Sequence, residues 1–303
     1  MTSSYRTAVA AALLIGTSVI GGGVGQAEPA PDTCRPWTAT TISSGHGMLE
    51  NLAFDGRGAM LLSRLAFGSP GSIDRLDPAG NYATVVASVE SPGGITVAGN
   101  TVYFATGNSP VSLLTGAKDG TVDTYDLDSG MRQTYARGLT MPNGLTTLPD
   151  GDLVVSGNQR LTVVHRSDPA RPEPYALAGV STNGLAVDPT GRWLYTDSTF
   201  DPTTKVFGVD IAAPGAPARE WPVPGFGLLN IGDDLTTDAA GNVYIALNLA
   251  GKVIRLNPAT GAQCTIAQGL TLTSSVRLGA GPGWDPNSLY ATGWDGSVRK
   301  LTP

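Results

Sequence analysis

The sequence predicts an all-β chain that folds as a six-bladed β-propeller, and two observations carry this prediction. A short phrase recurs along the chain at steps of roughly 40–50 residues, a period typical of propellers and other repeat folds. The last repeat also runs out of residues before it can form a fourth strand, whereas residues 37–43, ahead of the first repeat, have the missing pattern. A strand supplied from the N-terminal side closes a ring, and a stacked solenoid would need no such closure.

The recurring phrase opens each predicted blade with a polar residue or glycine, followed by alternating apolar residues that end at a glycine turn. Its copies begin at Glu50, Gly93, Asn143, Asn183 and Asp233, with a degraded copy at residues 276–278. We expect this phrase to form the innermost strand of each blade.

Two further strands complete the pattern of each repeat. Third strands are expected at residues 72–78, 121–125, 161–164, 205–209, 252–258 and 297–301. Fourth strands are expected at residues 82–87, 133–136, 174–177, 219–223 and 264–267, with residues 37–43 completing the last blade.

The first 27 residues have the features of a secretory signal peptide. Arg6 lies in a short polar start, an apolar stretch covers residues 8–24, and small residues precede a cleavage site after Ala27. The alternative is that this segment is retained as a membrane anchor. No later segment reaches the ~18 apolar residues of a membrane span. We therefore expect a secreted, extracytoplasmic protein in which residues 28–303 form one propeller domain.

The two cysteines, Cys34 and Cys264, are an even count, which in an exported protein favours a disulfide. Two buried thiols are the alternative. The propeller prediction places both residues on the outer strands of neighbouring blades.

The net charge argues against one class of partner, and the small number of histidines argues against one kind of metal site. The formal net charge is −6 and no basic cluster occurs, so nucleic acid is not expected as a partner. Only two histidines are present, His46 and His165, which is a poor donor set for structural zinc. His46 lies four residues before Glu50, and its role as a general base is a minor alternative.

The starts of the innermost strands are expected to meet at one end of the ring. The loops that follow the second strands reach the same end: residues 64–71, 107–120, 157–160, 198–204, 248–251 and 293–296. That end is therefore the predicted functional face.

Four oxygen-bearing residues occupy equivalent positions at this face: Glu50, Asn143, Asn183 and Asp233. Carboxylate and amide oxygens are the ligands that Ca²⁺ prefers, which predicts a metal site. The alternative is that Asn-Gly is a turn dipeptide, because both residues tolerate a left-handed backbone. Turn chemistry does not explain why the equivalent positions hold Glu50 and Asp233.

At these residues the chain resembles the superfamily of six-bladed calcium propellers that includes gluconolactonase, regucalcin, the luciferin-regenerating enzyme, paraoxonase and diisopropylfluorophosphatase. The resemblance covers essentially the whole chain after residue 27. Its strongest stretches are Met141-Pro142-Asn143-Gly144-Leu145, Thr182-Asn183-Gly184-Leu185-Ala186-Val187-Asp188-Pro189-Thr190-Gly191 and Asp233-Asp234-Leu235.

The resemblance implies roles for particular residues. Glu50, Asn143, Asn183 and Asp233 match the family's catalytic-metal ligands, and Asp234 matches an additional ligand of the paraoxonase branch. Shifting the match to the family pattern by one residue would make Asp234 rather than Asp233 the metal ligand, and we favour Asp233.

Blade 2 departs from the family pattern. The gluconolactonase branch has an Asn-Asp pair there and the paraoxonase branch a His-Gly, whereas this chain reads Pro92-Gly93-Gly94-Ile95. Gluconolactone specificity and a histidine-assisted attack by water are therefore not implied. The Pro-Gly-Gly-Ile form is closer to strictosidine-synthase-like propellers.

The leading hypothesis is a monomeric, metal-dependent hydrolase of a small-molecule lactone or ester. The cation, Ca²⁺ or alternatively Mg²⁺, Mn²⁺ or Zn²⁺, would polarise the carbonyl and activate water. Glu50, Asp233 or Asp234 would accept the proton. A non-catalytic binding scaffold with a structural metal, and an isomerase or lyase, are the alternatives.

Several residues near the predicted face are candidates for substrate contact. Asp197, Ser198 and Phe200 follow a second strand, although capping and turn roles are open for the first two. An apolar wall for an acyl or ring group is expected from Phe67, Phe200, Phe226, Leu228 and Leu229, with core packing as the alternative.

Overall fold

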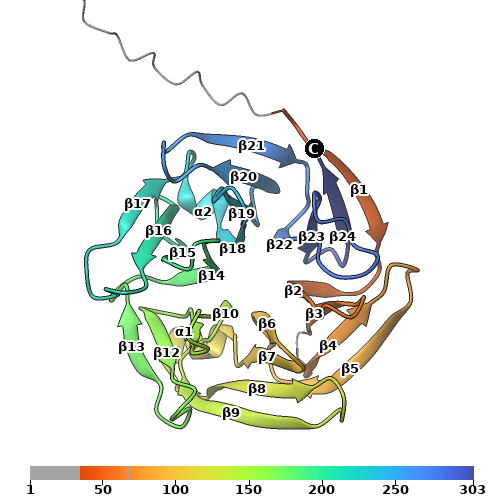
Figure 1. Cartoon of the computed structure of the whole chain (residues 1–303), viewed down its shortest axis with the longest axis vertical. Coiled ribbons are helices and arrows are strands. Elements are labelled where there is room, and N and C mark those ends of the chain that lie inside the picture. Colours follow the sequence, from red (N-terminus) through yellow and green to blue (C-terminus); the bar gives the residue numbers. More distant parts are fainter. Residues whose placement is uncertain (1–34, 67) are drawn as a thin grey trace, which may run out of the picture. The chain divides into compact units, whose positions relative to one another are not determined.

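The computed structural model describes residues 35–66 and 68–303, and Cys34, Phe67 and the predicted signal segment lie outside the described residues. Six four-stranded antiparallel sheets follow one another in a ring, which confirms the six-bladed β-propeller (Figure 1). In the first five blades the strands lie in chain order from the centre of the ring outward, and in the sixth the first strand of the chain is outermost.

The first three blades use consecutive strands. Blade 1 contains β2 (Met48–Phe54), β3 (Met60–Leu65), β4 (Gly71–Leu76) and β5 (Tyr82–Val89). Blade 2 contains β6 (Ile95–Ala98), β7 (Thr101–Thr106), β8 (Gly120–Asp126) and β9 (Arg132–Leu139). Blade 3 contains β10 (Leu145–Thr147), β11 (Leu153–Val155), β12 (Leu161–Val164) and β13 (Glu173–Ala176).

The other three blades repeat the arrangement. Blade 4 contains β14 (Thr182–Val187), β15 (Trp193–Ser198), β16 (Lys205–Asp210) and β17 (Arg219–Pro222). Blade 5 contains β18 (Gly232–Thr237), β19 (Val243–Leu247), β20 (Lys252–Leu256) and β21 (Gln263–Gln268). Blade 6 contains β22 (Thr273–Leu278), β23 (Leu289–Gly293), β24 (Val298–Thr302) and, from the other end of the chain, β1 (Thr38–Ser43). The predicted third and fourth strands are thus confirmed, although some end at slightly different residues.

Closure of the ring depends on β1, which pairs antiparallel with β24 and places Thr40 opposite Lys300. Just before this strand, the backbone N–H of Trp37 donates to the carbonyl of Ile266 in blade 5, at 2.7 Å. The N-terminal strand therefore joins two neighbouring blades, and it covers the edge that β24 would otherwise expose.

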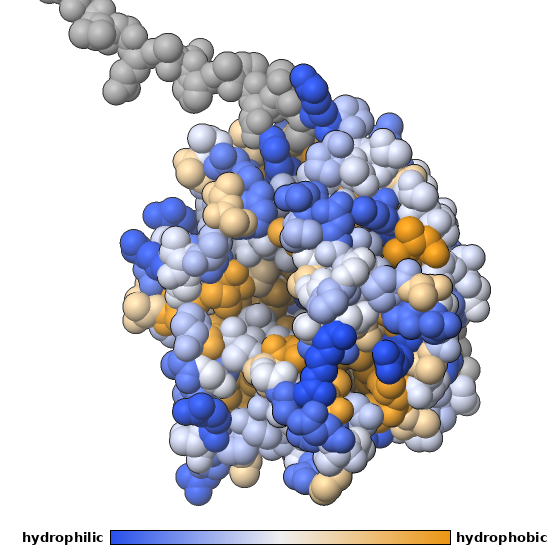
Figure 2. Space-filling view, turned by 45° about the vertical axis from the view of Figure 1, so that its right-hand side comes forward, coloured by the Kyte–Doolittle hydropathy of each residue, from blue (hydrophilic) through white to orange (hydrophobic). Residues whose placement is uncertain are grey.

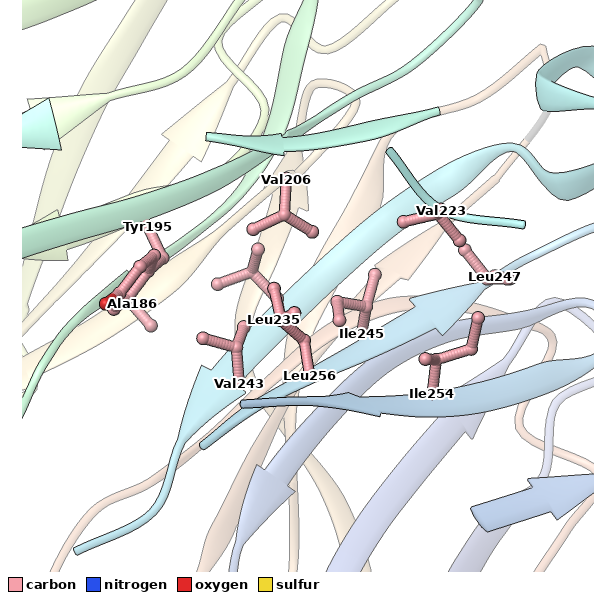
Figure 3. Packing of buried hydrophobic residues seen from close by; sticks show 10 residues of the cluster. All are labelled: Ala186, Tyr195, Val206, Val223, Leu235, Val243, Ile245, Leu247, Ile254 and Leu256. Atoms are coloured by element: carbon pink, nitrogen blue, oxygen red, sulfur yellow. The ribbon is translucent and has the colours of Figure 1, made fainter. Parts of the chain in front are cut away.

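The core consists of apolar layers between neighbouring blades. One such layer joins blades 4 and 5, where Val206 and Tyr195 pack near Leu235, Ile245 and Leu256 (Figure 3). The middle strand β19 is buried along its whole length because both of its faces meet a neighbouring blade, whereas only Val86 and Val89 of the outer strand β5 are buried. Burial on both faces agrees with the continuous apolar run from Val243 to Leu247.

The two ends of the ring use different connections. In blades 1 to 5 short turns follow the innermost strands, as at Asp188, whose Oδ1 accepts from the backbone N–H groups of Arg192 and Trp193. Gly191 has a φ of 72° in this turn, so this part of the family-like stretch is turn chemistry. The opposite end holds the loops after the second strands and the connections between blades, and among them two short helices that the sequence did not predict: α1 (Pro110–Thr115) and α2 (Gly227–Asn230).

In the part of the chain that the structure describes, no helix has the length and apolar character needed to cross a membrane.

Candidate functional site

The predicted ligands lie where the innermost strands begin, and local irregularities of the backbone set their direction. The strand register shifts between Leu49 and Asn51 in β2, around Asn183 in β14 and around Asp233 in β18. A bulge of this kind redirects one side chain relative to a regular strand and is common beside functional sites. Three separate blades therefore have a bulge at the residue that is predicted to bind the metal.

Burial is common to all four predicted ligands. Glu50 and Asp233 are each 4% exposed, and Asn143 and Asn183 are each 6% exposed. Uncompensated burial of carboxylates is costly, so their partners decide what the site can do.

Asp233 is held by two amides. Nδ2 of Asn183 donates to its Oδ1 at 3.0 Å, and Nδ2 of Asn248 donates to its Oδ2 at 2.8 Å. The structure therefore brings Asn183 and Asp233 into direct contact across two blades.

Glu50 is held from blades 2 and 6. Nδ2 of Asn108 donates to its Oε1 at 3.1 Å, and the indole N–H of Trp294 donates to its Oε2 at 2.6 Å. Burial raises the pKa of Glu50 to about 7, although these two hydrogen bonds oppose the rise. Burial, and then the nearby charge of Glu50, also raise the pKa of Asp233 well above its ordinary value. The two carboxylates are thus close enough to repel each other when both are ionised.

The backbone at Asn143 and Gly144 lies next to the backbone of Asn183. The carbonyl of Asn143 accepts from the N–H of Gly94 at 2.5 Å, and a Cβ at Gly144 would lie 2.2 Å from the carbonyl oxygen of Asn183. Within the described residues, the side-chain amide of Asn143 has no hydrogen-bond partner, so its oxygen is available to a ligand.

The left-handed turn interpretation of Asn-Gly is wrong for this chain. Neither Asn143 and Gly144 nor Asn183 and Gly184 appear among the described residues with positive φ. The glycines are instead needed for close approach, since a Cβ at Gly184 would lie 2.5 Å from the backbone nitrogen of Leu235. Glycine allows the inner strands of neighbouring blades to meet without a side chain between them.

Asp234 points to different partners from Asp233. Its Oδ2 accepts from Nη1 of Arg277 at 2.6 Å and from the hydroxyl of Ser275. Its Oδ1 is buried without a hydrogen-bond partner in the described chain. Burial raises the pKa of Asp234, while the Arg277 charge opposes the rise. Asp233 is therefore the one of the two that contacts Asn183, whereas Asp234 forms an ion pair with Arg277 of blade 6. The charge of Asp234 nevertheless also raises the pKa of Glu50.

The donor set fits a hard divalent cation. Two carboxylates and two amides supply only oxygen, and a cation would remove the repulsion between Glu50 and Asp233. No group of three or more His, Cys, Asp or Glu side chains suited to a metal occurs among residues 35–66 and 68–303.

The predicted substrate contacts separate into two kinds. Asp197 and Ser198 are fully buried; Oδ1 of Asp197 accepts from the N–H of Gly184 at 2.9 Å, and Oγ of Ser198 accepts from the N–H of Lys205 at 3.0 Å. These contacts favour the structural roles that were left open for them. Phe200 is 46% exposed and stays a candidate for substrate contact.

His46 does not accompany Glu50. Its ring stacks on Tyr82 of the outer strand β5, with 3.9 Å between ring centroids, and its Nε2 lies 2.6 Å from the hydroxyl of Ser43. These contacts assign His46 to packing at the outside of blade 1 rather than to general-base chemistry.

Sequence reasoning missed the three donors that hold the carboxylates: Asn108, Asn248 and Trp294. Each follows a second strand, inside loops that were expected at the functional face. Their positions could have been singled out by asking which polar side chains these loops carry.

A cavity of about 330 Å³ lies between blades 2 and 3, beside Asn143. Its lining includes Pro142 and Ser156 near the centre of the ring, and Lys118 and Arg160 farther out. None of the four predicted ligands lines it, so it is adjacent to the site and not the site itself.

Comparisons with known proteins support the fold. No protein-family model matches the chain, and no curated protein matches it. Among solved structures, a gluconolactonase from Xanthomonas campestris superposes with a TM-score of 0.69 at 15% identity, covering 90% of this chain and 96% of that one. A calcium-binding protein, regucalcin, from Agrobacterium tumefaciens gives 0.66 at 16% identity, covering 88% and 94%.

A virginiamycin B lyase from Staphylococcus aureus also superposes, with a TM-score of 0.61 at 11% identity, covering 88% of this chain and 99% of that one. The chain thus has the propeller fold of the superfamily that it resembles. Because proteins of different activity share this fold, function has to be argued from the site.

Proposed function

We propose that this protein is a Ca²⁺-dependent hydrolase that acts on a small-molecule lactone or ester. The observation that carries the proposal is the pair of buried carboxylates, Glu50 and Asp233, which lie beside the amides of Asn143 and Asn183 at one end of the ring. The likeness to a gluconolactonase and to regucalcin supports a lactonase-type activity and a divalent cation.

The chain's own residues would have distinct roles in this reaction. Glu50, Asn143, Asn183 and Asp233 would hold the cation, which supplies Lewis-acid polarisation of a carbonyl and lowers the pKa of nearby water. Asn108 and Trp294 fix the orientation of Glu50, and Asn248 fixes that of Asp233. These hydrogen bonds keep the oxygen atoms in place before a substrate arrives.

Either Glu50 or Asp233 would accept the proton from the attacking water. These are the two carboxylates that would lie beside water activated by the cation, which is the position that a general base requires. Asp234 is the least suited of the three predicted carboxylates, because Arg277 and Ser275 already hold its Oδ2.

The proposal is tested by elemental analysis and calcium titration of purified residues 28–303, with lactone and aryl-ester hydrolysis assayed on the same samples. The Glu50→Gln/Asp233→Asn double variant is expected to lose both bound calcium and turnover. Asp119→Asn, an exposed acid in a loop at the same end, is the matched control and should keep both. Calcium binding without turnover of any lactone or ester would refute the hydrolase.

A calcium-bound scaffold without catalysis is the second candidate, and blade 2 favours it. A Cβ at Gly93 would lie 2.7 Å from the carbonyl oxygen of Asn143, so no side chain fits where the family's enzymes place substrate contacts. In the calcium titration and hydrolysis experiment, this candidate predicts metal binding and no turnover.

We also propose that the protein is exported. The support is the signal-like pattern of residues 1–27, which lies outside the described residues. Mass spectrometry of the protein recovered from the culture medium would check cleavage after Ala27, and an intact N-terminus on a cell-associated chain would contradict it.

A further inference from the structure

Large apolar side chains are exposed on the loops at the end of the ring that holds the candidate site. We name six of them the apolar collar: Val111, Leu114, Phe200, Phe226, Leu228 and Leu229. Leu114 is 84% exposed and Leu229 is 61% exposed. Figure 2 shows apolar surface gathered around a hollow in the middle of one view of the molecule. Grouped exposure of this kind usually marks a binding surface.

Both short helices of the collar bury polar or small residues and expose apolar side chains. In α1 the buried residue is Ser112, whose hydroxyl donates to the carbonyl of Ala117 and accepts from the N–H of Met141, while Val111 and Leu114 face outward. In α2 the buried residues are Gly227 and Asn230, and the two leucines are exposed. A helix that only covers a core buries its apolar side, so these helices are built to present theirs.

The collar is attached to the residues that hold the carboxylates. Helix α1 begins at Pro110, two residues after Asn108, which donates to Glu50. Helix α2 ends at Asn230, and the next carbonyl, of Ile231, accepts from the N–H of Asn248, which holds Asp233. Both helices lie inside the ring of outermost strands in Figure 1.

The loop that carries Phe200 packs on α2. The N–H of Gly227 donates to the carbonyl of Pro202 at 2.8 Å, and a Cβ at Gly227 would lie 2.1 Å from the carbonyl oxygen of Asp201. Phe200 and the leucines of α2 are therefore parts of one surface.

We infer that the collar binds the apolar part of an amphiphilic substrate, an alkyl- or aryl-substituted lactone or ester, whose carbonyl group reaches Glu50 and Asp233. This inference rests on the proposed hydrolase function and specifies its substrate class. A polyhydroxylated sugar lactone offers nothing that matches exposed leucine and phenylalanine side chains.

Charge disfavours a lipid surface as the occupant. The chain has a formal net charge of −6, and neither helix carries a basic residue in its last turn. Anionic membrane surfaces attract basic segments, which these helices are not.

The test uses two matched series of small molecules, in which a lactam or lactone ring carries alkyl chains of increasing length. Non-hydrolysable γ-alkyl-γ-lactams are titrated into the calcium-loaded protein by calorimetry, and the corresponding γ-lactones are assayed for hydrolysis. Full burial of a methylene group corresponds to about a fourfold gain in affinity, so partial burial over four methylenes should give at least about a tenfold gain. KM for the lactones should fall in parallel.

The Leu114→Ser/Leu229→Ser double variant should abolish this dependence of lactam affinity on chain length. Met131→Ser is the matched control, because Met131 is 57% exposed but lies in the turn between β8 and β9, away from the collar. Both changes remove exposed side chains, so neither is expected to affect folding.

The outcomes separate the two proposals. Hydrolysis without dependence on chain length would overturn the collar inference and leave the hydrolase standing. Lactam affinity that rises with chain length, without hydrolysis of any lactone, would support the collar and refute the hydrolase. Binding to phosphatidylcholine vesicles that is lost in the double variant, with no dependence on chain length, would assign the collar to a membrane surface and overturn the inference.

Discussion

Gly144 illustrates how single residues fix the geometry of the site. The residue has an ordinary backbone conformation, yet a Cβ there would lie 2.2 Å from the carbonyl oxygen of Asn183 and 2.9 Å from Oγ of Ser156. The hydroxyl of Ser156 also accepts the N–H of Gly144 at 2.6 Å. Glycine therefore serves close approach between two blades at the point where Asn143 and Asn183 meet.

Gly144→Ala is expected to lower the free energy of unfolding by about 1–3 kcal/mol, the range typical of overpacking, because its new methyl group meets backbone that cannot easily move. Urea denaturation measures the change. Gly215→Ala is the matched control, since a Cβ at Gly215 would have nothing within 4 Å and the position has no positive φ. Equal stability of the two variants would contradict the close-approach argument.

Asp233 and Asp234 are neighbours in sequence with different expected roles. Asp233→Asn should weaken calcium binding by more than about 100-fold, because even partners that only orient a ligand typically contribute about 10–100-fold. Asp234→Asn should weaken it by about tenfold or less. Calcium titration of both variants shows which of the two aspartates is the ligand. A larger loss of calcium affinity in Asp234→Asn than in Asp233→Asn would make Asp234 the ligand.

At the scale of elements, the repeat pattern predicts some features far better than others. The strands and the four ligand positions recur at blade spacing, so one copy supports the next. The two helices and the donors Asn108, Asn248 and Trp294 lie in loops that differ from blade to blade. No period connects these loop residues, and their contacts with Glu50 or Asp233 span as many as 244 sequence positions.

Blade 3 carries an ion pair at the end opposite the site, where Nδ1 of His165 lies 2.5 Å from Oδ2 of Asp152. The hydrogen bond from this ring to Asp152 raises the pKa of His165. A raised folded-state pKa means that the stabilisation is complete below the ordinary value of 6.5 and is lost as the pH rises through the raised value.

We therefore expect the difference in unfolding free energy between the native chain and His165→Asn to shrink as the pH rises from about 6 to 9. Chemical denaturation at several pH values measures it. The side chain is 41% exposed, so the effect should be modest. A difference that stays constant with pH would show that His165 contributes packing only.

At the scale of the whole molecule, stability depends on joining the two ends of the chain. Strand β1 completes blade 6 by pairing with β24, and Trp37 packs against Tyr244 of blade 5 with 5.7 Å between ring centroids. The predicted Cys34–Cys264 disulfide would reinforce the same junction, but Cys34 lies outside the described residues and the bridge stays a prediction. Opening this junction would expose an edge strand and release the N-terminal segment from two blades.

A chain that begins at residue 44 should therefore be less stable and should self-associate, whereas a chain that begins at residue 35 keeps β1 and Trp37 and lacks residues 28–34, which include Cys34. Loss of the Trp37 packing alone should lower stability on the order of 2 kcal/mol, and the unpaired edge of β24 adds to this. Thermal unfolding and light scattering compare the two chains. If both are equally destabilised relative to residues 28–303, the disulfide and not β1 closes the ring; if neither is, closure by this segment is not what stabilises the propeller.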